Sequence, residues 1–225
     1  MTFSSWMHQS RPASSSTFGW ICFQVGLFLL PSSAFLAGLF LLPALVLGSL
    51  KRSISYWADF WNYPFIVAAI LMFIGCFRAY SGSLAWLGLA NWLPFFWCFW
   101  SFQSYLSIPE ARKRSALLLV SGTVPVLITG FGQLWLQWEG PWQLFNGLII
   151  WFMVPGGQPM GRLSGLFDYA NITGAWLAMI WPLCLATLFQ PFLNRLQKSV
   201  VLFLAVSMVV ALVLTDSRNA WGALI

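Results

Sequence analysis

Two arginines near the end of the chain are the residues whose type and position could do chemistry. Arg162 and Arg218 bracket two long apolar runs, and Asp168 and Asp216 lie close to them in sequence. Only 7% of the residues are charged, and ionisable groups beside apolar segments are costly, so they need a physical reason. An arginine presents a planar fork of N–H donors that matches a phosphate or a carboxylate. Arg162 and Arg218 are therefore candidate catalytic residues that would grip an anionic group and neutralise developing charge.

A structural role for these arginines is the alternative. Each could pair with its nearby carboxylate, Asp168 or Asp216, to orient a loop, or could anchor to lipid headgroups. Asp168 could also act as a general base on an acceptor hydroxyl. An ion pair with Arg162 is the favoured interpretation, because structural pairs are commoner than catalytic carboxylates. Asn171 is expected at a helix entry, where its side chain can accept from the first free amides.

The composition places these residues in a helical membrane protein. Hydrophobic residues make up 60% of the 225, whereas soluble domains have about 45–50% apolar residues. Membrane-spanning strands would alternate apolar and polar residues, and these runs do not. Helices satisfy their own backbone groups in lipid, so the chain is predicted to be all-α. The net charge of +6 is scattered and forms no basic face, which argues against a nucleic-acid partner.

The order of apolar runs predicts a polytopic transmembrane bundle. A polar tail, residues 1–17, precedes a transmembrane domain over residues 18–225. The first two runs form either a tight hairpin or one broken segment, because the first is short for a span of about 20 residues. We expect roughly seven spans and the start of an eighth, so the sequence is interpreted as part of a longer protein. The expected spans cover residues 18–30, 33–50, 64–77, 84–103, 115–136, 172–189 and 200–214, and the eighth opens at Ala220.

One connection differs from the others in length and composition. Residues 137–168 are rich in proline and glycine and contain an apolar island at 142–154, which is predicted to be a short interfacial or re-entrant helix. Trp138 and Trp142 in this loop are candidate glycan contacts, because aromatic faces can pack on sugar rings. Interface anchoring is the alternative for both tryptophans.

The basic residues predict the orientation of the spans. With the N-terminus in the cytoplasm, most of the lysines and arginines fall inside, as the positive-inside rule requires. Only Arg78, Arg162 and Arg218 fall outside, together with Glu139, Asp168 and Asp216. The two candidate arginines would then share the non-cytoplasmic face.

The last third of the chain resembles the O-antigen ligase and polymerase family of bacterial membrane proteins. The resemblance lies in GRLSGLFDYANITGAWLAMIWPL, which leads into a span with a proline, and in TDSRNAW after the next span. Two departures are Asp168-Tyr169-Ala170, where a small Asn-containing turn is usual, and Asn219, where glycine is usual. The matching positions are Arg162, Gly165, Phe167, Asn171 and Pro182 in the first stretch and Thr215, Ser217, Arg218, Ala220 and Trp221 in the second.

This resemblance implies glycosyl transfer at the outer face of the bacterial inner membrane. A glycan on an undecaprenyl-diphosphate carrier would pass to an acceptor sugar, with Arg162 and Arg218 neutralising the diphosphate and with Asp168, Asn171 and Ser217 contacting substrate. A neighbouring branch of the family is associated with bicarbonate uptake, so a small-anion transporter is the alternative. Family members have a further external loop beyond this region, and the present chain alone is expected to be inactive.

No cofactor or metal is predicted. The sequence has no P-loop, GxGxxG, CxxC or HExxH pattern, so nothing supports nucleotide or zinc chemistry. The four cysteines lie inside apolar runs without metal-ligand spacing, where packing is their expected role. The expected partners are the lipid-linked glycan and membrane lipids.

Overall fold

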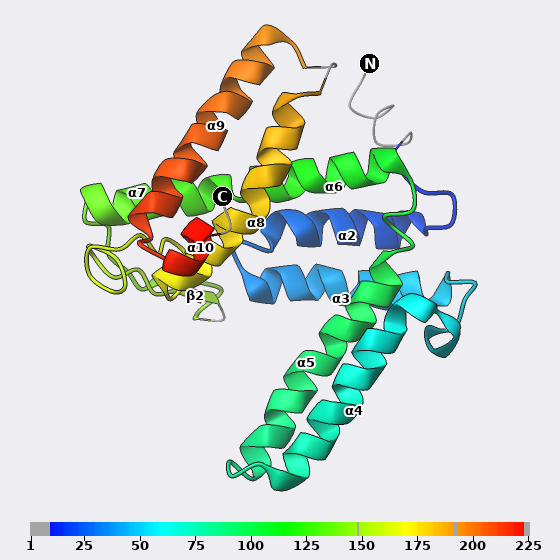
Figure 1. The fold of residues 1–225 in the computed structure, drawn as a ribbon. Helices are drawn as coiled ribbons and strands as arrows, with labels where there is room; N and C mark the ends of the chain where they lie inside the picture. The colour runs from blue at the N-terminus through cyan, green and yellow to red at the C-terminus, as the bar shows by residue number, and fades with distance from the viewer. Residues whose placement is uncertain (1–9, 148, 191–192, 223–225) are drawn as a thin grey trace. The chain divides into compact units, whose positions relative to one another are not determined.

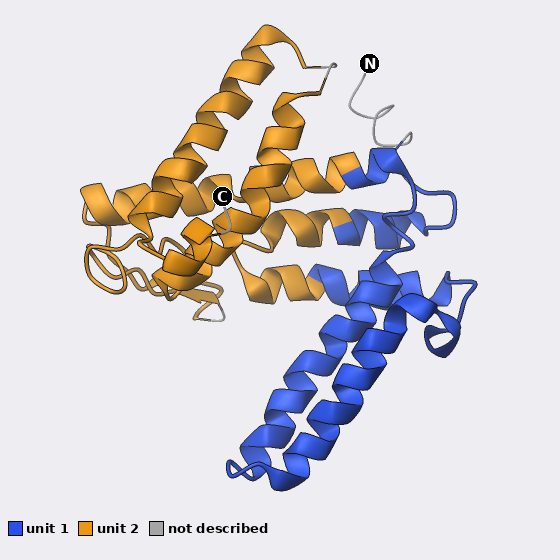
Figure 2. Ribbon diagram, in the orientation of Figure 1, with its two compact units in different colours: residues 1–23, 40–112 blue, residues 24–39, 113–225 orange. Residues whose placement is uncertain are grey.

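The computed structural model describes residues 10–147, 149–190 and 193–222, and these are mostly helical (Figure 1). The chain divides into two compact units, and each is described by itself (Figure 2). Unit 1 comprises residues 1–23 and 40–112, and unit 2 comprises residues 24–39 and 113–225. The division cuts through α2 (Thr17–Leu29), α3 (Ala34–Leu50) and α6 (Pro109–Gly122). The first two apolar runs of the sequence form two separate helices, α2 and α3.

Unit 1 is dominated by a helical hairpin. Two short 3-10 helices, η1 (Tyr56–Ala58) and η2 (Phe60–Asn62), lead into α4 (Tyr63–Arg78), and α5 (Ser83–Phe102) returns beside it. Aromatic rings join the two helices at both ends. Phe65 packs on Phe99 with ring centroids 4.7 Å apart, and Phe73 packs on Trp86 at 5.3 Å. Aromatic packing thus holds α4 against α5 at both ends of the hairpin.

The carboxyl end of α5 is fixed by a buried tyrosine. Tyr105 is fully buried, and its hydroxyl donates to the carbonyl of Ala44 in α3 at 2.8 Å. Burial raises the pKa of Tyr105 to about 12, so the hydroxyl stays protonated and remains a donor. The Phe23 ring stacks on Tyr105 with centroids 4.9 Å apart. This cluster connects the start of α2 and the end of α3 to α5 within unit 1.

Unit 2 contains the remaining helices and a small β-hairpin. Its elements after α6 are α7 (Val124–Trp135), β1 (Trp142–Leu144), β2 (Ile149–Trp151), α8 (Ala170–Leu188), α9 (Arg195–Leu214) and α10 (Arg218–Gly222). α8 and α9 lie side by side, and α9 begins with a capping box formed by Asn194 and Gln197. Their facing sides form the core of the unit, which includes Leu177, Ile180, Met208 and Leu212.

The predicted span over residues 115–136 is broken into two helices. α6 ends at Gly122 and α7 begins at Val124, with Thr123 between them. Pro125 has no N–H to donate to the carbonyl four residues earlier, which weakens the helix at this point. At the break, the Thr123 amide is shared between the carbonyls of Leu119 and Val120.

The short helix predicted for residues 142–154 is wrong. β1 and β2 pair there as an antiparallel hairpin, with Trp142 opposite Trp151 and Leu144 opposite Ile149. The backbone has positive φ at Asn146 (57°) and Gly147 (90°). Asn-Gly is a strong signal for a hairpin turn, because both residues tolerate this conformation. The apolar content of the segment concealed that signal.

Four described helical segments are long and apolar enough to cross a membrane, and these are Phe60–Arg78, Pro109–Trp135, Ala170–Leu188 and Arg195–Leu214. α2 and α3 are also apolar but shorter. The predicted mostly helical fold is confirmed, and these segments have the length and composition that the predicted membrane association requires. Of the predicted tail, residues 1–9 lie outside the described residues, as do residues 223–225 of the predicted eighth span.

Candidate functional site

Arg162 lies in a loop that one buried side chain organises. Gln133, on α7, is fully buried, and its Oε1 accepts from the Gly165 amide at 2.8 Å and from the Ser164 hydroxyl at 3.1 Å. Its Nε2 donates to the carbonyl of Val154 at 2.8 Å. A single glutamine therefore satisfies backbone groups on both sides of Arg162, groups that would be costly if buried without partners. Sequence reasoning missed Gln133, although a glutamine inside an apolar run was the available signal.

The loop approaches its own backbone closely at one glycine. Gly157 has a φ of +89°, and a Cβ added there would lie 1.8 Å from the Arg162 carbonyl oxygen. Only glycine fits this combination of conformation and space. The next residue after the arginine, Leu163, is fully buried and donates its amide to the Leu214 carbonyl at 2.9 Å. Arg162 is thereby placed against the end of α9.

The Arg162 guanidinium binds the turn that follows α9. Its Nε donates to the Thr215 carbonyl at 2.7 Å, and its Nη2 donates to the Asp216 carbonyl at 2.9 Å and to Asn171 Oδ1 at 2.7 Å. A cation is stabilised by the partial negative charge at a helix C-terminus, where carbonyls lack helical partners. The two N–H groups of Nη1 have no acceptor among the described residues. Arg162 thus combines a structural role with a remaining pair of donors.

Arg218 follows the same turn by two residues. It is the first residue of α10, and its side chain is exposed without a hydrogen bond to any described residue. Ser217 before it is buried, and its carbonyl accepts from the Trp221 amide at 3.0 Å. A Cβ on Gly174 would come within 2.9 Å of the Ser217 Cβ, so glycine at this position of α8 lets α10 pack closely. The structure therefore brings the two segments with the predicted arginines together.

A cavity of about 330 Å³ lies beside this turn, between α8 and α10. Asn171, Ser217 and Asn219 supply its polar groups, and Ala175, Ala178 and Met179 supply apolar ones. Two predicted substrate contacts, Asn171 and Ser217, are thus neighbours at one cavity. Asn171 lies at the entry of α8 as predicted, but the α8 N-cap is Tyr169, and the Asn171 side chain accepts from Arg162 rather than from backbone amides. Asn219, noted only as a departure from glycine, also lines the cavity.

The predicted ion pairs of the two arginines are absent. No carboxylate of the described residues lies within 4 Å of the Arg162 or Arg218 guanidinium. Asp168 is exposed and lines a different cavity of about 340 Å³, with the turn before α3, β2 and Phe167. The Asp216 backbone adopts a φ of +46° and offers its carbonyl, not its carboxylate, to Arg162. Short sequence separation therefore did not translate into side-chain pairing at either arginine.

The two loop tryptophans form their own cluster. The Trp138 and Trp142 ring centroids are 5.9 Å apart, and the Trp138 ring covers the backbone of Gly132 in α7. The described residues that line the cavity beside Arg162 include neither tryptophan. Trp142 is 41% exposed at the start of the hairpin, where it is available to a ligand or a lipid. The structure does not bring either ring to the lining of the arginine site.

The arrangement favours anion binding over metal chemistry. Arg162 donates to Asn171 of the cavity lining, and Arg218 lies in the chain between two further lining residues, Ser217 and Asn219. Both arginines have open N–H donors, and such donors bind phosphate oxygens in pairs. The described residues contain no group of three or more histidine, cysteine, aspartate or glutamate side chains that could hold a metal ion. The described lining of the cavity also has no carboxylate or histidine to take up a proton.

No family model matches this chain, and the comparisons with curated proteins and with solved structures give no match. The likeness to the O-antigen ligase and polymerase family rests on the two sequence stretches around Arg162 and Arg218.

Proposed function

We propose that this chain functions as an integral membrane glycan ligase or polymerase that acts on an undecaprenyl-diphosphate-linked glycan. The observation that carries the proposal is the pairing of the two sequence stretches in unit 2. Arg162 binds the backbone two and three residues before Arg218, and both arginines have N–H donors that no described residue accepts from. A diphosphate bears the charge and the oxygen geometry that two such donors recognise.

The arginines would act on the leaving group. The acceptor hydroxyl oxygen forms a bond to the anomeric carbon while the bond from that carbon to the diphosphate breaks. Arg162 and Arg218 neutralise the charge that develops on the departing diphosphate. Asn171 and Ser217 would orient the substrate from the cavity wall. The described cavity lining supplies no base, so the acceptor proton passes to a group outside this lining.

The proposal includes a topology of roughly seven spans in the bacterial inner membrane with a cytoplasmic N-terminus. Its support is that predicted external segments meet within unit 2. Trp151 of the hairpin donates its indole N–H to the Ser32 carbonyl at 2.6 Å, and Arg162 binds the turn after α9. Lys113 lines a cavity with Gln190 at the end of α8, so two predicted internal segments also meet. External segments are expected to meet one another, and internal segments to meet one another, when successive spans alternate in direction.

Ligand binding tests the proposal independently of an assay for glycan transfer. The chain in nanodiscs would be titrated with undecaprenyl diphosphate, and the affinity of Arg218→Ala would be compared with wild type. Loss of one charge-assisted phosphate contact should weaken binding about tenfold. Arg195→Ala, at the opposite end of α9, is the matched control and should bind normally. Equal affinity of wild type and Arg218→Ala would reject the proposed role of this arginine.

Transport of a small anion is the competing function. Proteoliposomes that contain the chain would be assayed for uptake of labelled bicarbonate and, in parallel, for glycan transfer. The proposal requires transfer that depends on Arg218 and no uptake above that of empty liposomes. Bicarbonate uptake without undecaprenyl diphosphate binding would replace the ligase interpretation with the transporter interpretation.

A further inference from the structure

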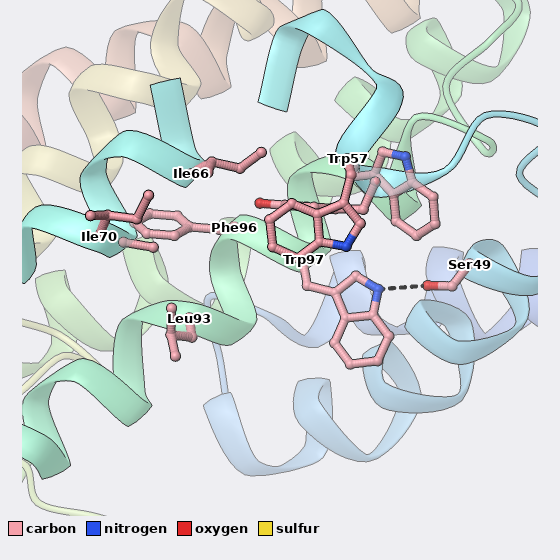
Figure 3. Close-up of a pocket in the computed structure, with 10 residues that line it drawn as sticks. Ser49, Trp57, Ile66, Ile70, Leu93, Phe96 and Trp97 are labelled. Atoms are coloured by element: carbon pink, nitrogen blue, oxygen red, sulfur yellow. Dashed lines mark hydrogen bonds between the residues drawn. The ribbon is translucent and has the colours of Figure 1, made fainter. Parts of the chain in front are cut away.

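A separate cavity of about 570 Å³ lies inside unit 1, between the two helices of the α4–α5 hairpin (Figure 3). Its walls are apolar along most of their length. α4 contributes Ile66, Ala69 and Ile70, and α5 contributes Leu93 and Phe96. A volume of this size is within the range of about 300–1,000 Å³ that is typical of ligand pockets. The cavity is therefore large enough for an extended apolar group.

One end of the cavity carries hydrogen-bond donors. Figure 3 shows Trp57, Trp97 and Ser49 at this end, where the Trp97 indole N–H donates to the Ser49 hydroxyl at 2.8 Å. Trp100 also lines the cavity and is only 7% exposed, and its buried indole N–H has no acceptor among the described residues. A buried donor without an acceptor is costly, so the Trp100 indole is an unsatisfied polar group next to the cavity.

Positive charge lies next to this donor. The Arg52 guanidinium carbon is 5.6 Å from the centre of the Trp100 ring. Its Nη2 binds Asp59 at 2.6 Å and Gln103 at 3.0 Å, while its buried Nε has no acceptor among the described residues. Asp59 offsets the charge of Arg52. Lys51 is exposed and has no ion pair with any described residue, so it gives this end a net positive charge.

The residues around the polar end suit the level where membrane meets water. Trp57, Phe60 and Trp61 are each about 70% exposed, and such aromatic side chains favour the headgroup region. The remainder of the cavity follows α4 along Phe60–Arg78, a candidate span with 11% of its apolar window buried within the protein. The cavity thus runs from headgroup depth towards the apolar interior, as a phospholipid does.

We propose that this cavity binds one acyl chain of an anionic phospholipid. The chain would lie between α4 and α5, the glycerol esters would lie at the end formed by Trp57 and Trp97, and the phosphate would lie near Lys51 and Arg52. Each basic residue near an anionic headgroup attracts it, and apolar chain burial adds to this. The site lies in unit 1, apart from Arg162 and Arg218, so it does not depend on the proposed glycan chemistry.

The test is native mass spectrometry of the chain released from nanodiscs of phosphatidylglycerol or of phosphatidylethanolamine. The wild type should retain one phosphatidylglycerol in preference to phosphatidylethanolamine. Ala69→Phe fills the cavity and should abolish retention, whereas Ala90→Phe, on the exposed side of α5, should retain lipid as the wild type does. Lys51→Gln should lower retention of phosphatidylglycerol about fivefold, and Lys198→Gln in unit 2 should not change it.

Three results would overturn the inference. These are equal retention of both lipids by the wild type, retention by Ala69→Phe at the wild-type level, and a dimer that replaces the lipid adduct and disappears in Ala69→Phe. The last result would show that a second copy of the chain occupies the cavity. Lys51→Gln changes only an exposed side chain, so its result does not depend on whether Ala69→Phe folds. Circular dichroism of each variant establishes that the helices remain.

Discussion

Arg162 and Arg218 carry the same guanidinium group in different surroundings. Arg162 donates three hydrogen bonds, to the carbonyls of Thr215 and Asp216 and to Asn171, and so closes the end of α9. Arg218 donates none to the described residues and is exposed at the start of α10. We therefore expect substitution of Arg162 to reduce both stability and ligand binding, and substitution of Arg218 to reduce ligand binding alone.

Replacing Arg162 with lysine should destabilise the protein, because a single ammonium group cannot reach all three acceptors of the planar guanidinium. We expect Arg162→Lys to lower the free energy of unfolding by about 1–3 kcal/mol. Denaturant titration in mixed micelles, followed by circular dichroism, measures this change. Arg218→Ala is the matched control and should unfold as the wild type does. A smaller loss for Arg162→Lys than for Arg218→Ala would contradict the structural role of Arg162.

The loop between β2 and α8 has few regular hydrogen bonds of its own and depends on neighbouring helices. Gln133 of α7 holds Val154, Ser164 and Gly165, and α9 accepts the Leu163 amide. Within the loop, Gly157 approaches the Arg162 carbonyl. This irregular loop thus holds the Arg162 side chain in a defined position, because the buried polar groups of the loop have hydrogen-bond partners on the helices.

Two glycines of this loop allow the cost of a left-handed backbone conformation to be measured apart from the cost of a steric clash. Gly157 and Gly161 have similar φ values, +89° and +84°, but a Cβ would collide with the Arg162 carbonyl only at Gly157. Gly161→Ala should cost about 1 kcal/mol for the left-handed conformation alone. Gly157→Ala should cost about 3 kcal/mol or more, because backbone must also move. Thermal unfolding of both variants measures the difference, and equal losses would contradict the close approach.

At the scale of the molecule, charged residues of unit 2 separate between its two ends. Arg162, Arg218 and Asp216 lie at the end where α7 and α9 finish and the hairpin lies, and Arg195 and Lys198 lie at the start of α9 (Figure 1). The charged residues at the start of α9 are all basic, whereas the end with Arg162 and Asp216 carries both basic and acidic residues. This distribution is what the positive-inside rule produces when the first end faces away from the cytoplasm.

Cysteine labelling of intact cells tests that orientation. Gln143→Cys, exposed in β1, should react with a membrane-impermeant maleimide in intact cells. Lys198→Cys, exposed near the start of α9, should react only after permeabilisation, because it lies at the proposed cytoplasmic end. The parent chain supplies the background, since three of its four cysteines are buried. Labelling of Lys198→Cys in intact cells, with none of Gln143→Cys, would reverse the topology and remove the site from the outer face.

The helices were largely predictable, because local properties decide them. Runs of apolar residues bounded by polar or charged turns predicted α4, α5, α8 and α9 to within a few residues at most of their ends. The split at Thr123 and the hairpin at 142–151 were missed for local reasons as well. Pro125 and the Asn146-Gly147 pair were visible, but the apolar character of the surrounding residues outweighed them.

The sequence by itself determined which segments are helical and apolar, and it marked Arg162 and Arg218 as unusual in their surroundings. Asn171 and Ser217 became candidates through the family resemblance. Only the tertiary structure decided their partners. Arg162 binds carbonyls more than fifty residues away instead of Asp168, and Gln133 supports the loop from another helix. The physical reason is that apolar periodicity depends on neighbouring residues, whereas the satisfaction of buried polar groups depends on segments that meet only when the chain folds.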